Sequence, residues 1–248
     1  MGTSQSSTGP SGKSPLVPPW ADGAPQALVT PPRARLKSFR QQLGKAVLNG
    51  DVSNLKKSLG HYARSATGGA GNAVVRLGGA IKAGNFLIGL LSGNSLPTES
   101  LSVDLSKLSG ISCEKAVAII VESLVAGDGD SDKIRSAMSS ALIESLDGVD
   151  AFDANIMTDD LLVNIMINYL SECIFLMIMN DAGHALNKAK NASDCIRIES
   201  EMKELIKVIV DKKLNVYLAD GYQIINTAKV GEIERQVIVD VWNEWEGY

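Results

Sequence analysis

The chain has 248 residues, of which 45% are hydrophobic, so it is long and apolar enough for one large domain or two small ones. Aromatic residues make up only 5%, and we therefore expect a core of Leu, Ile, Val, Met and Ala. The net charge of −4 is unevenly spread: residues 1–82 carry 11 Lys/Arg and two acids (+9), and residues 83–248 carry 13 Lys/Arg and 26 acids (−13). This asymmetry indicates different partners for the two halves or contact between them, although an ordinary solvated surface fits it as well.

Two further features concern the cellular compartment. The N-terminus has neither a basic start nor an apolar run, so we expect no secretory signal. The three cysteines, Cys113, Cys173 and Cys195, are widely spaced and odd in number. That pattern argues against a disulfide framework and predicts a reduced, cytoplasmic protein.

Residues 1–32 form a tail that cannot fold alone. A Ser/Gly-rich start leads into Pro15-Leu16-Val17-Pro18-Pro19-Trp20, and seven of the eight prolines fall within this tail. Such a composition predicts an extended or disordered segment with short polyproline character, suited to docking on a partner.

The remainder, residues 33–248, is almost free of proline and predicts a single, bundle-like α-helical domain. The first helix is expected over 33–48, with Leu36, Phe39, Leu43 and Val47 on its apolar face and Asn49-Gly50 as its stop. A second is expected over 53–66, with Leu55, Leu59 and Tyr62 inward, ending at Gly68-Gly69.

Residues 60–93 form a Gly-rich helical segment, with eight glycines between 68 and 93. Its spacing matches no phosphate-binding loop, because no Lys-Ser/Thr follows the glycines. Each helical glycine costs about 1 kcal/mol relative to Ala, so close helix packing or a hinge must offset the loss.

Later helices are expected over 113–126, 132–146, 158–190, 193–213 and 232–245, with Ser112, Asp130 or Ser131, Thr158 and Ser193 at their starts. Residues 214–226 fit a short hairpin or a helix equally. The apolar run 161–179 resembles a membrane span, but Asn164, Asn168, Ser171 and Glu172 share one helical face. We therefore expect a buried helix with a polar edge and no membrane segment.

Candidate catalytic and metal sites are weak. Asp128, Asp130 and Asp132 begin like a calcium loop, but Lys133 and Ser139 occupy the positions of its Gly and Glu, so a turn with a helix cap is expected. The two histidines, His61 and His184, have no Cys or His at ligand spacing. No motif supports catalysis, and we expect a protein without enzymatic activity, cofactor or metal.

The start of the tail carries the sharper chemistry. Removal of Met1 would leave the α-amine of Gly2, whose pKa near 8 keeps about a tenth of it as free base at pH 7. Because glycine has no Cβ, this amine can enter a narrow pocket and accept an acyl group. The start also fits a myristoylation pattern, and a merely polar start remains the plain alternative.

Three segments together resemble the QatB family of the bacterial Qat anti-phage defence system: residues 1–4, residues 15–20, and Gly60-His61-Tyr62-Ala63-Arg64-Ser65-Ala66-Thr67-Gly68-Gly69. Beyond about residue 70 the likeness is only a general helical character. The resemblance implies three companions, an ATPase, a QueC-like enzyme (QatC) and a TatD-like nuclease. QueC enzymes use ATP to activate a carboxyl-deazaguanine for amidation, so a QueC-like partner could use a protein amine, and ATP and zinc would belong to that partner.

The resemblance leads to one main hypothesis and two alternatives. In the main one, the tail binds the QueC-like partner and presents Gly2 for conjugation, with Thr3 and Ser4 near the pocket, Pro15, Leu16, Val17, Pro18, Pro19 and Trp20 as an anchor, and His61, Tyr62 and Arg64 contacting a partner. In the second, the chain is a structural adaptor that is never modified. In the third, the basic region 33–82 binds nucleic acid.

Overall fold

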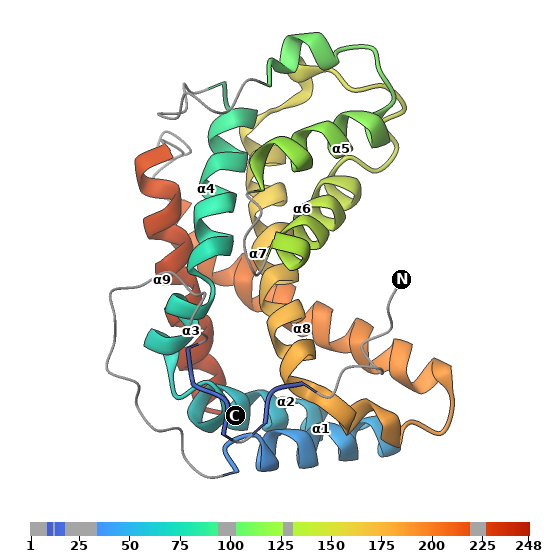
Figure 1. The fold of residues 1–248 in the computed structure, drawn as a ribbon, viewed down its shortest axis with the longest axis vertical. Coiled ribbons are helices and arrows are strands. Elements are labelled where there is room, and N and C mark those ends of the chain that lie inside the picture. The colour runs from blue at the N-terminus through green and yellow to red at the C-terminus, as the bar shows by residue number, and fades with distance from the viewer. Residues whose placement is uncertain (1–8, 12, 18–33, 94–102, 126–130, 219–226) are drawn as a thin grey trace. The chain divides into compact units, whose positions relative to one another are not determined.

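The computed structural model describes residues 9–11, 13–17, 34–93, 103–125, 131–218 and 227–248. Within these ranges every regular element is a helix (Figure 1), and one isolated antiparallel bridge joins Ser112 and Ala151. The predicted mostly α-helical class is confirmed. The elements are α1 (Lys37–Asn49), α2 (Val52–His61), the π-helix η2 (Tyr62–Ala66), α3 (Ala70–Arg76), α4 (Gly78–Leu91), η3 (Leu105–Leu108), α5 (Cys113–Leu124), α6 (Ser131–Ser145), η4 (Ala154–Ile156), α7 (Asp159–Ala182), η5 (Gly183–Lys188), α8 (Ala192–Leu218) and α9 (Thr227–Glu246).

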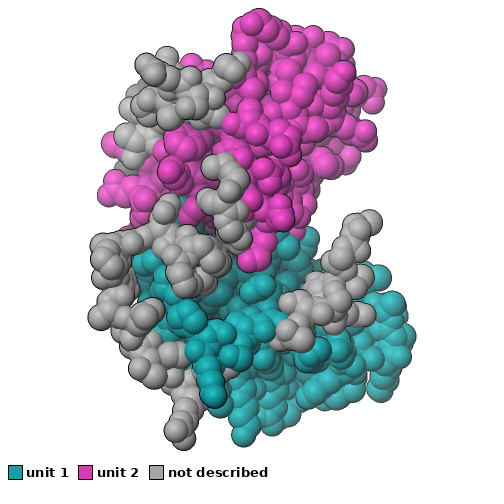
Figure 2. Space-filling view, viewed as in Figure 1, with its two compact units in different colours: residues 1–78, 174–209, 237–248 teal, residues 79–173, 210–236 magenta. Residues whose placement is uncertain are grey.

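The helices fall into two compact units, coloured separately in Figure 2. Unit 1 comprises Met1–Gly78, Ile174–Ile209 and Val237–Tyr248, and unit 2 comprises Gly79–Cys173 and Val210–Gln236. Helices α7, α8 and α9 each contribute residues to both units.

The first two helices of unit 1 follow the sequence prediction closely. Helix α1 ends at Gly50, whose φ of 64° is the left-handed conformation expected of an Asn-Gly stop. The Asp51 side chain then caps α2 by accepting a hydrogen bond from the Ser53 backbone N–H. All predicted inward residues of these helices are buried: Leu36, Phe39, Leu43, Val47, Leu55, Leu59 and Tyr62.

Most buried apolar side chains of the described residues are Leu, Ile, Val, Met and Ala, as expected, and four aromatic side chains pack together within unit 1. Tyr62 packs against Phe39 and Trp242 with ring centroids 4.8 and 6.3 Å away, and Trp242 packs against Trp245 at 5.1 Å. All four side chains are fully buried. These four rings therefore form one aromatic cluster within a largely aliphatic core.

The Gly-rich segment contains two kinds of glycine. Gly68 and Gly69 have φ of 75° and 97° and form the turn that leads into α3. Gly84 in α4 has an ordinary helical backbone but a crowded surface: a Cβ there would lie 2.4 Å from Glu234 Oε1 and 2.7 Å from Tyr169 Cε1. At Gly84, close packing within unit 2 therefore offsets the low helix propensity.

Helix α7 together with the following η5 is long and apolar enough to cross a membrane, and so are α3 and α4 if these two helices, which are bent relative to each other, are taken as one span. However, 78% of the apolar window of the α7–η5 span is buried inside the structure. Its polar edge lies partly in the interior, because Asn168 and Ser171 are buried. Asn168 donates a hydrogen bond from Nδ2 to Ser145 Oγ of α6, 2.9 Å away. The burial fits the core helix predicted from the polar stripe.

The helix starts were predicted with partial success. Thr158 accepts a hydrogen bond from the Leu161 N–H, as expected of a cap. The prediction for α8 was wrong by two residues: Asn191, not Ser193, caps it, since Asn191 Oδ1 accepts from the Asp194 N–H at 2.9 Å. Residues 214–218 continue α8 as helix, and the rest of the hairpin-or-helix segment lies outside the described residues.

Candidate tail-binding site

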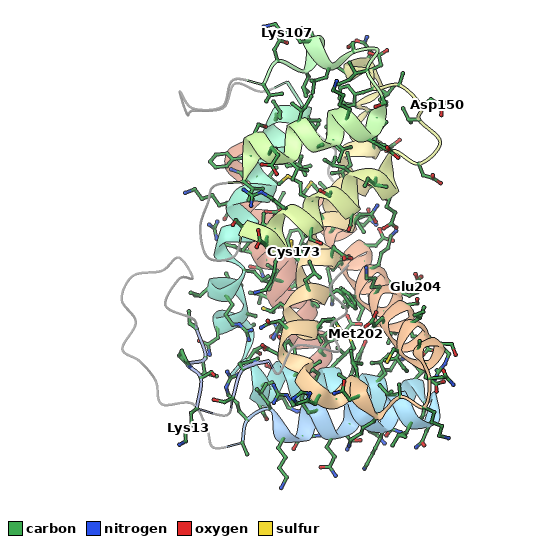
Figure 3. The ribbon with its side chains drawn as sticks, turned by 45° about the vertical axis from the view of Figure 1, so that its right-hand side comes forward. Lys13, Lys107, Asp150, Cys173, Met202 and Glu204 are labelled. Carbon is green, nitrogen blue, oxygen red and sulfur yellow. The ribbon has the colours of Figure 1, made fainter. Side chains whose placement is uncertain are left out.

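Part of the predicted tail is described, and it lies against the helices of unit 1. Gly2, Thr3, Ser4, Pro18, Pro19 and Trp20 lie outside the described residues, whereas Pro15, Leu16 and Val17 lie inside them. We call residues 9–11 and 13–17 the bound segment. Lys13, labelled in Figure 3, marks it on the surface.

Two arginines hold the bound segment through its backbone. Arg40 of α1 donates from Nη2 to the Pro10 carbonyl, 2.8 Å away. Arg35, just before α1, donates from Nη2 to the carbonyls of Ser14 and Pro15, both at 3.3 Å. Because these bonds go to main-chain oxygens, they fix the path of the segment while leaving its side chains free to vary.

Side-chain packing adds to these hydrogen bonds at the two ends of the segment. Leu16 is buried, with 9% of its surface exposed, and it lies beside the turn glycine Gly68. At the other end, Gly9 has a φ of 61°, and a Cβ there would lie 2.6 Å from the Asn180 carbonyl oxygen of α7. Only glycine fits this position without displacing the segment.

The two arginines belong to a largely buried polar network, which we call the Asp181 cluster: Arg35, Arg40, Tyr62, Arg76 and Asp181. Asp181 has no exposed surface, and its carboxylate pairs with Arg76 Nη1 at 2.9 Å and accepts a hydrogen bond from the Tyr62 hydroxyl at 2.9 Å. Its backbone carbonyl accepts from Arg40 Nε at 2.9 Å. Arg35 also donates to the Ala66 carbonyl, so each tail-binding arginine is anchored to the helical body by a second bond.

Burial in the cluster shifts the pKa values of Tyr62, Arg35 and Arg40. Burial, reinforced by the Asp181 charge, raises the pKa of Tyr62 well above its usual value, so the hydroxyl stays protonated and donates. Burial lowers the pKa of Arg35 and of Arg40, and Asp181 opposes that shift. Arginine remains charged in proteins, so these side chains stay cationic donors for the tail carbonyls.

Local backbone structure brings these side chains together. Tyr62 begins the π-helix η2, which ends where Thr67 Oγ1 donates to the carbonyls of Tyr62 and Ala63. Trp242 Nε1 in turn donates to Thr67 Oγ1 at 3.0 Å, and so ties η2 to α9. Asp181 lies in the last turn of α7, at the end of its long apolar run.

The three helical residues that were predicted to contact a partner, His61, Tyr62 and Arg64, differ in their exposure to solvent. Tyr62 has no exposed surface and belongs to the Asp181 cluster. Arg64 is exposed and donates to the carbonyls of Glu246 and Tyr248. His61 is half-buried, and burial together with the Arg64 charge lowers its pKa.

Sequence reasoning missed the residues that build the site. Arg35 and Arg40 counted only as part of a basic region, and Arg76 and Asp181 were not singled out. A signal was available for Asp181: a lone carboxylate that ends an apolar helix is rarely buried without a charged partner. Nothing in the sequence shows which cation pairs with it.

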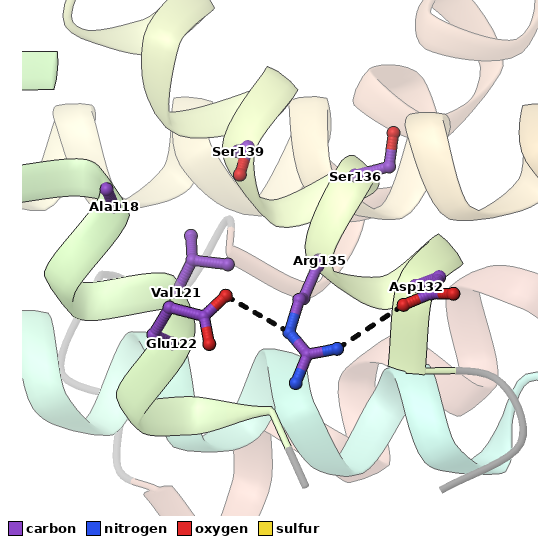
Figure 4. Close-up of a pocket in the computed structure, with 7 residues that line it drawn as sticks. All are labelled: Ala118, Val121, Glu122, Asp132, Arg135, Ser136 and Ser139. Carbon is purple, nitrogen blue, oxygen red and sulfur yellow. Dashed lines mark hydrogen bonds and ion pairs between the residues drawn. The ribbon is translucent and has the colours of Figure 1, made fainter. Parts of the chain in front are cut away.

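Two further concave places occur among the described residues. In unit 2, a groove between α5 and α6 is centred on Arg135, which pairs with Glu122 and Asp132 at 3.3 and 3.4 Å (Figure 4). Because both carboxylates are well exposed, this arrangement is an ordinary surface ion-pair network. In unit 1, a groove is lined by Val52, Ser53, Lys56, Lys57 and Tyr248. The described residues contain no group of three His, Cys, Asp or Glu side chains that could hold a metal ion.

A family model described as QatB, Qat anti-phage system associated protein QatB, matches residues 68–244. No curated protein and no solved structure matches the chain. The matched range includes Arg76 and Asp181, whereas the bound segment and the two arginines that hold it precede that range.

Proposed function

The chain belongs to the QatB family and is therefore a component of an anti-phage defence system, and from this premise we propose that it presents the α-amine of Gly2 to a QueC-like partner for conjugation. The observation that carries the proposal is that the helical body binds the tail by its backbone at residues 10, 14 and 15. The bound segment is therefore held at a fixed place on the helices of unit 1, and Gly2 lies seven residues before Gly9 in the sequence.

The chemistry needs only what the amine and the partner supply. The partner would activate the carboxyl group of a deazaguanine with ATP. The free-base nitrogen of Gly2 then attacks the activated carbonyl, an amide bond forms, the activating group leaves with the bonding electrons, and the amine proton passes to a base. The chain itself contributes a nucleophile and its positioning, so we assign it no enzymatic activity, and we place ATP and zinc with the partner.

Contact with the ATPase and the TatD-like nuclease of the system would occur through the helical body. We place the protein in the cytoplasm, and none of its three cysteines, Cys113, Cys173 and Cys195, forms a disulfide in the structure. Thr3 and Ser4 would contact the pocket around Gly2, and Trp20 would strengthen partner binding.

Substitutions in the tail separate this proposal from an adaptor that is never modified. A bulky Gly2→Trp change should abolish phage resistance in a plaque assay, while the same bulk placed at Ser7 should not. An unmodified adaptor predicts the opposite sensitivity: Trp20→Ala impairs defence and Gly2→Ala does not. Full resistance from the Gly2→Trp chain would refute the conjugation proposal.

A nucleic-acid-binding function is the second candidate, and one observation favours it. The exposed residues of α1 and α2 include Lys37, Lys45, Lys56 and Lys57, and Asp51 is the single acid between residues 34 and 78. If this surface binds DNA, the isolated protein should retain a duplex in a gel shift and release it steeply as salt rises. Charge reversal at Lys45 and Lys56 should then weaken retention equally for unrelated sequences.

A further inference from the structure

We infer that the bound segment limits how far Gly2 can reach, and that the QueC-like partner must therefore engage unit 1 beside the C-terminal end of α7. This inference rests on the proposed function, because it concerns the same tail. It adds where the partner docks.

The bound segment has a preformed binding site. Arg40 is oriented by its bond to the Asp181 carbonyl and Arg35 by its bond to the Ala66 carbonyl, independently of the tail. Asp181 is in turn held by Tyr62 and Arg76, both buried. The donors for the tail carbonyls are thus positioned before the segment binds, which lowers the entropic cost of binding it.

Within the bound segment, Gly9 is held closely against the helical body. Its positive φ and its approach to Asn180 fix the residue against the end of α7. Seven residue steps separate Gly9 from Gly2, and a fully extended chain spans at most about 25 Å over that length. For comparison, a chain attached only from Ala34 onward would have thirty-two steps before it and a reach of roughly 100 Å.

The reach of Gly2 limits where the active centre of the partner can lie. Conjugation requires the Gly2 nitrogen to reach the activated carbonyl inside the partner, so that centre must open within about 25 Å of Gly9 while the segment is bound. Binding also raises the effective concentration of Gly2 for a partner docked nearby and lowers it to nearly zero for one beyond reach. The surface around the end of α7 in unit 1 is therefore where the partner docks.

The experiment compares tether length in bound and released tails, in chains coexpressed with the partner. Deleting residues 6–8 keeps Gly2 to Gln5 intact and shortens the reach to about 14 Å. Replacing the same three residues by glycine is the length-matched control. To release the bound segment, we substitute two of its own residues, Gly9→Val and Leu16→Asp. No residue of the helical body is changed, so the packing of the helices is kept.

The expected result is an interaction between the two changes. In the bound tail the deletion should lower the modified fraction of Gly2 by at least about tenfold, and in the released tail it should change that fraction less than about twofold. The glycine replacement should have little effect in either chain. Equal loss in both chains, or no loss in the bound tail, would overturn the inference.

A second measurement tests the segment without any modification. In a Leu16→Cys chain the thiol should react with maleimide at least about tenfold more slowly than a cysteine at exposed Lys13, and Gly9→Val should remove that protection. Equal labelling rates at the two positions would overturn the inference even if Gly2 is modified. Protected Leu16→Cys in a chain whose Gly2 is never modified would instead refute the proposed function and leave the binding of the segment standing.

Discussion

Replacing Asp181 by asparagine tests the network on which tail binding depends. The change keeps the size of the side chain and removes its charge, so Arg76, only 7% exposed, loses the carboxylate that lies 2.9 Å from its guanidinium. Removing one partner of a buried ion pair costs about 3–5 kcal/mol, because the other charge stays buried and uncompensated. We therefore expect Asp181→Asn to lower the free energy of unfolding of unit 1 by about that amount.

Two comparisons show whether the loss comes from the unpaired charge. Tyr62→Phe removes only a hydrogen bond to a charged acceptor, and should cost about 1.5–3 kcal/mol. Asp51→Asn makes the same substitution at an exposed helix cap, where asparagine caps equally well, and should stay within about 0.5 kcal/mol of the unsubstituted chain. Adding Arg76→Met to Asp181→Asn should recover most of the loss, since a methionine needs no counter-charge.

Urea denaturation followed by tryptophan fluorescence is a suitable assay. Trp242 and Trp245 are fully buried in unit 1, and a Trp20→Phe background removes the third tryptophan. The remaining fluorescence then comes from two tryptophans within unit 1. A loss below about 1 kcal/mol for Asp181→Asn, or no recovery on adding Arg76→Met, would refute the reasoning.

Two further predictions concern unit 2 and the Gly-rich segment. Gly84→Ala should lower the free energy of unfolding by about 1–3 kcal/mol in urea denaturation, because the new Cβ would lie 2.7 Å from Tyr169 Cε1. At Gly71 a new Cβ would have nothing within 4 Å, so Gly71→Ala should raise the free energy of unfolding by up to about 1 kcal/mol. Equal effects of the two substitutions would contradict the packing role of Gly84. Glu234 is buried without a hydrogen-bond partner among the described residues, and burial raises its pKa well above the usual value, with Arg235 opposing. The folded state then binds the proton more tightly than the unfolded state, so the contribution of Glu234 is present below about pH 4.3 and is lost as pH rises from there toward the folded pKa. Glu234→Gln should remove this part of the pH dependence, and parallel pH profiles of unfolding for the two chains would contradict it.

The sequence predicted the helices well because their signals are local. The stop at Gly50 needs only an Asn-Gly pair, and the inward face of α1 follows from the spacing of Phe39, Leu43 and Val47. The start of α8 was placed at Ser193 because serine and asparagine are comparable caps, and only the hydrogen bond to Asn191 distinguishes them.

The tail-binding site could not be predicted, because its residues are far apart in the chain. Arg76 and Asp181 meet across more than a hundred residues, and Arg40 contacts both Pro10 and Asp181. A Pro- and Ser-rich tail has no periodic pattern that indicates which surface it binds. The family was predicted from segments before residue 70 and is confirmed by a match over residues 68–244, so the sequence evidence and the family match depend on almost separate parts of the chain.

Mass spectrometry of the N-terminal peptide, from chain coexpressed with its QueC-like partner in phage-resistant cells, tests the central claim most directly. We expect Met1 to be absent and Gly2 to carry one deazaguanine acyl group in amide linkage. This modification should disappear when the partner is omitted. A free α-amine on Gly2 in cells that resist phage would contradict it.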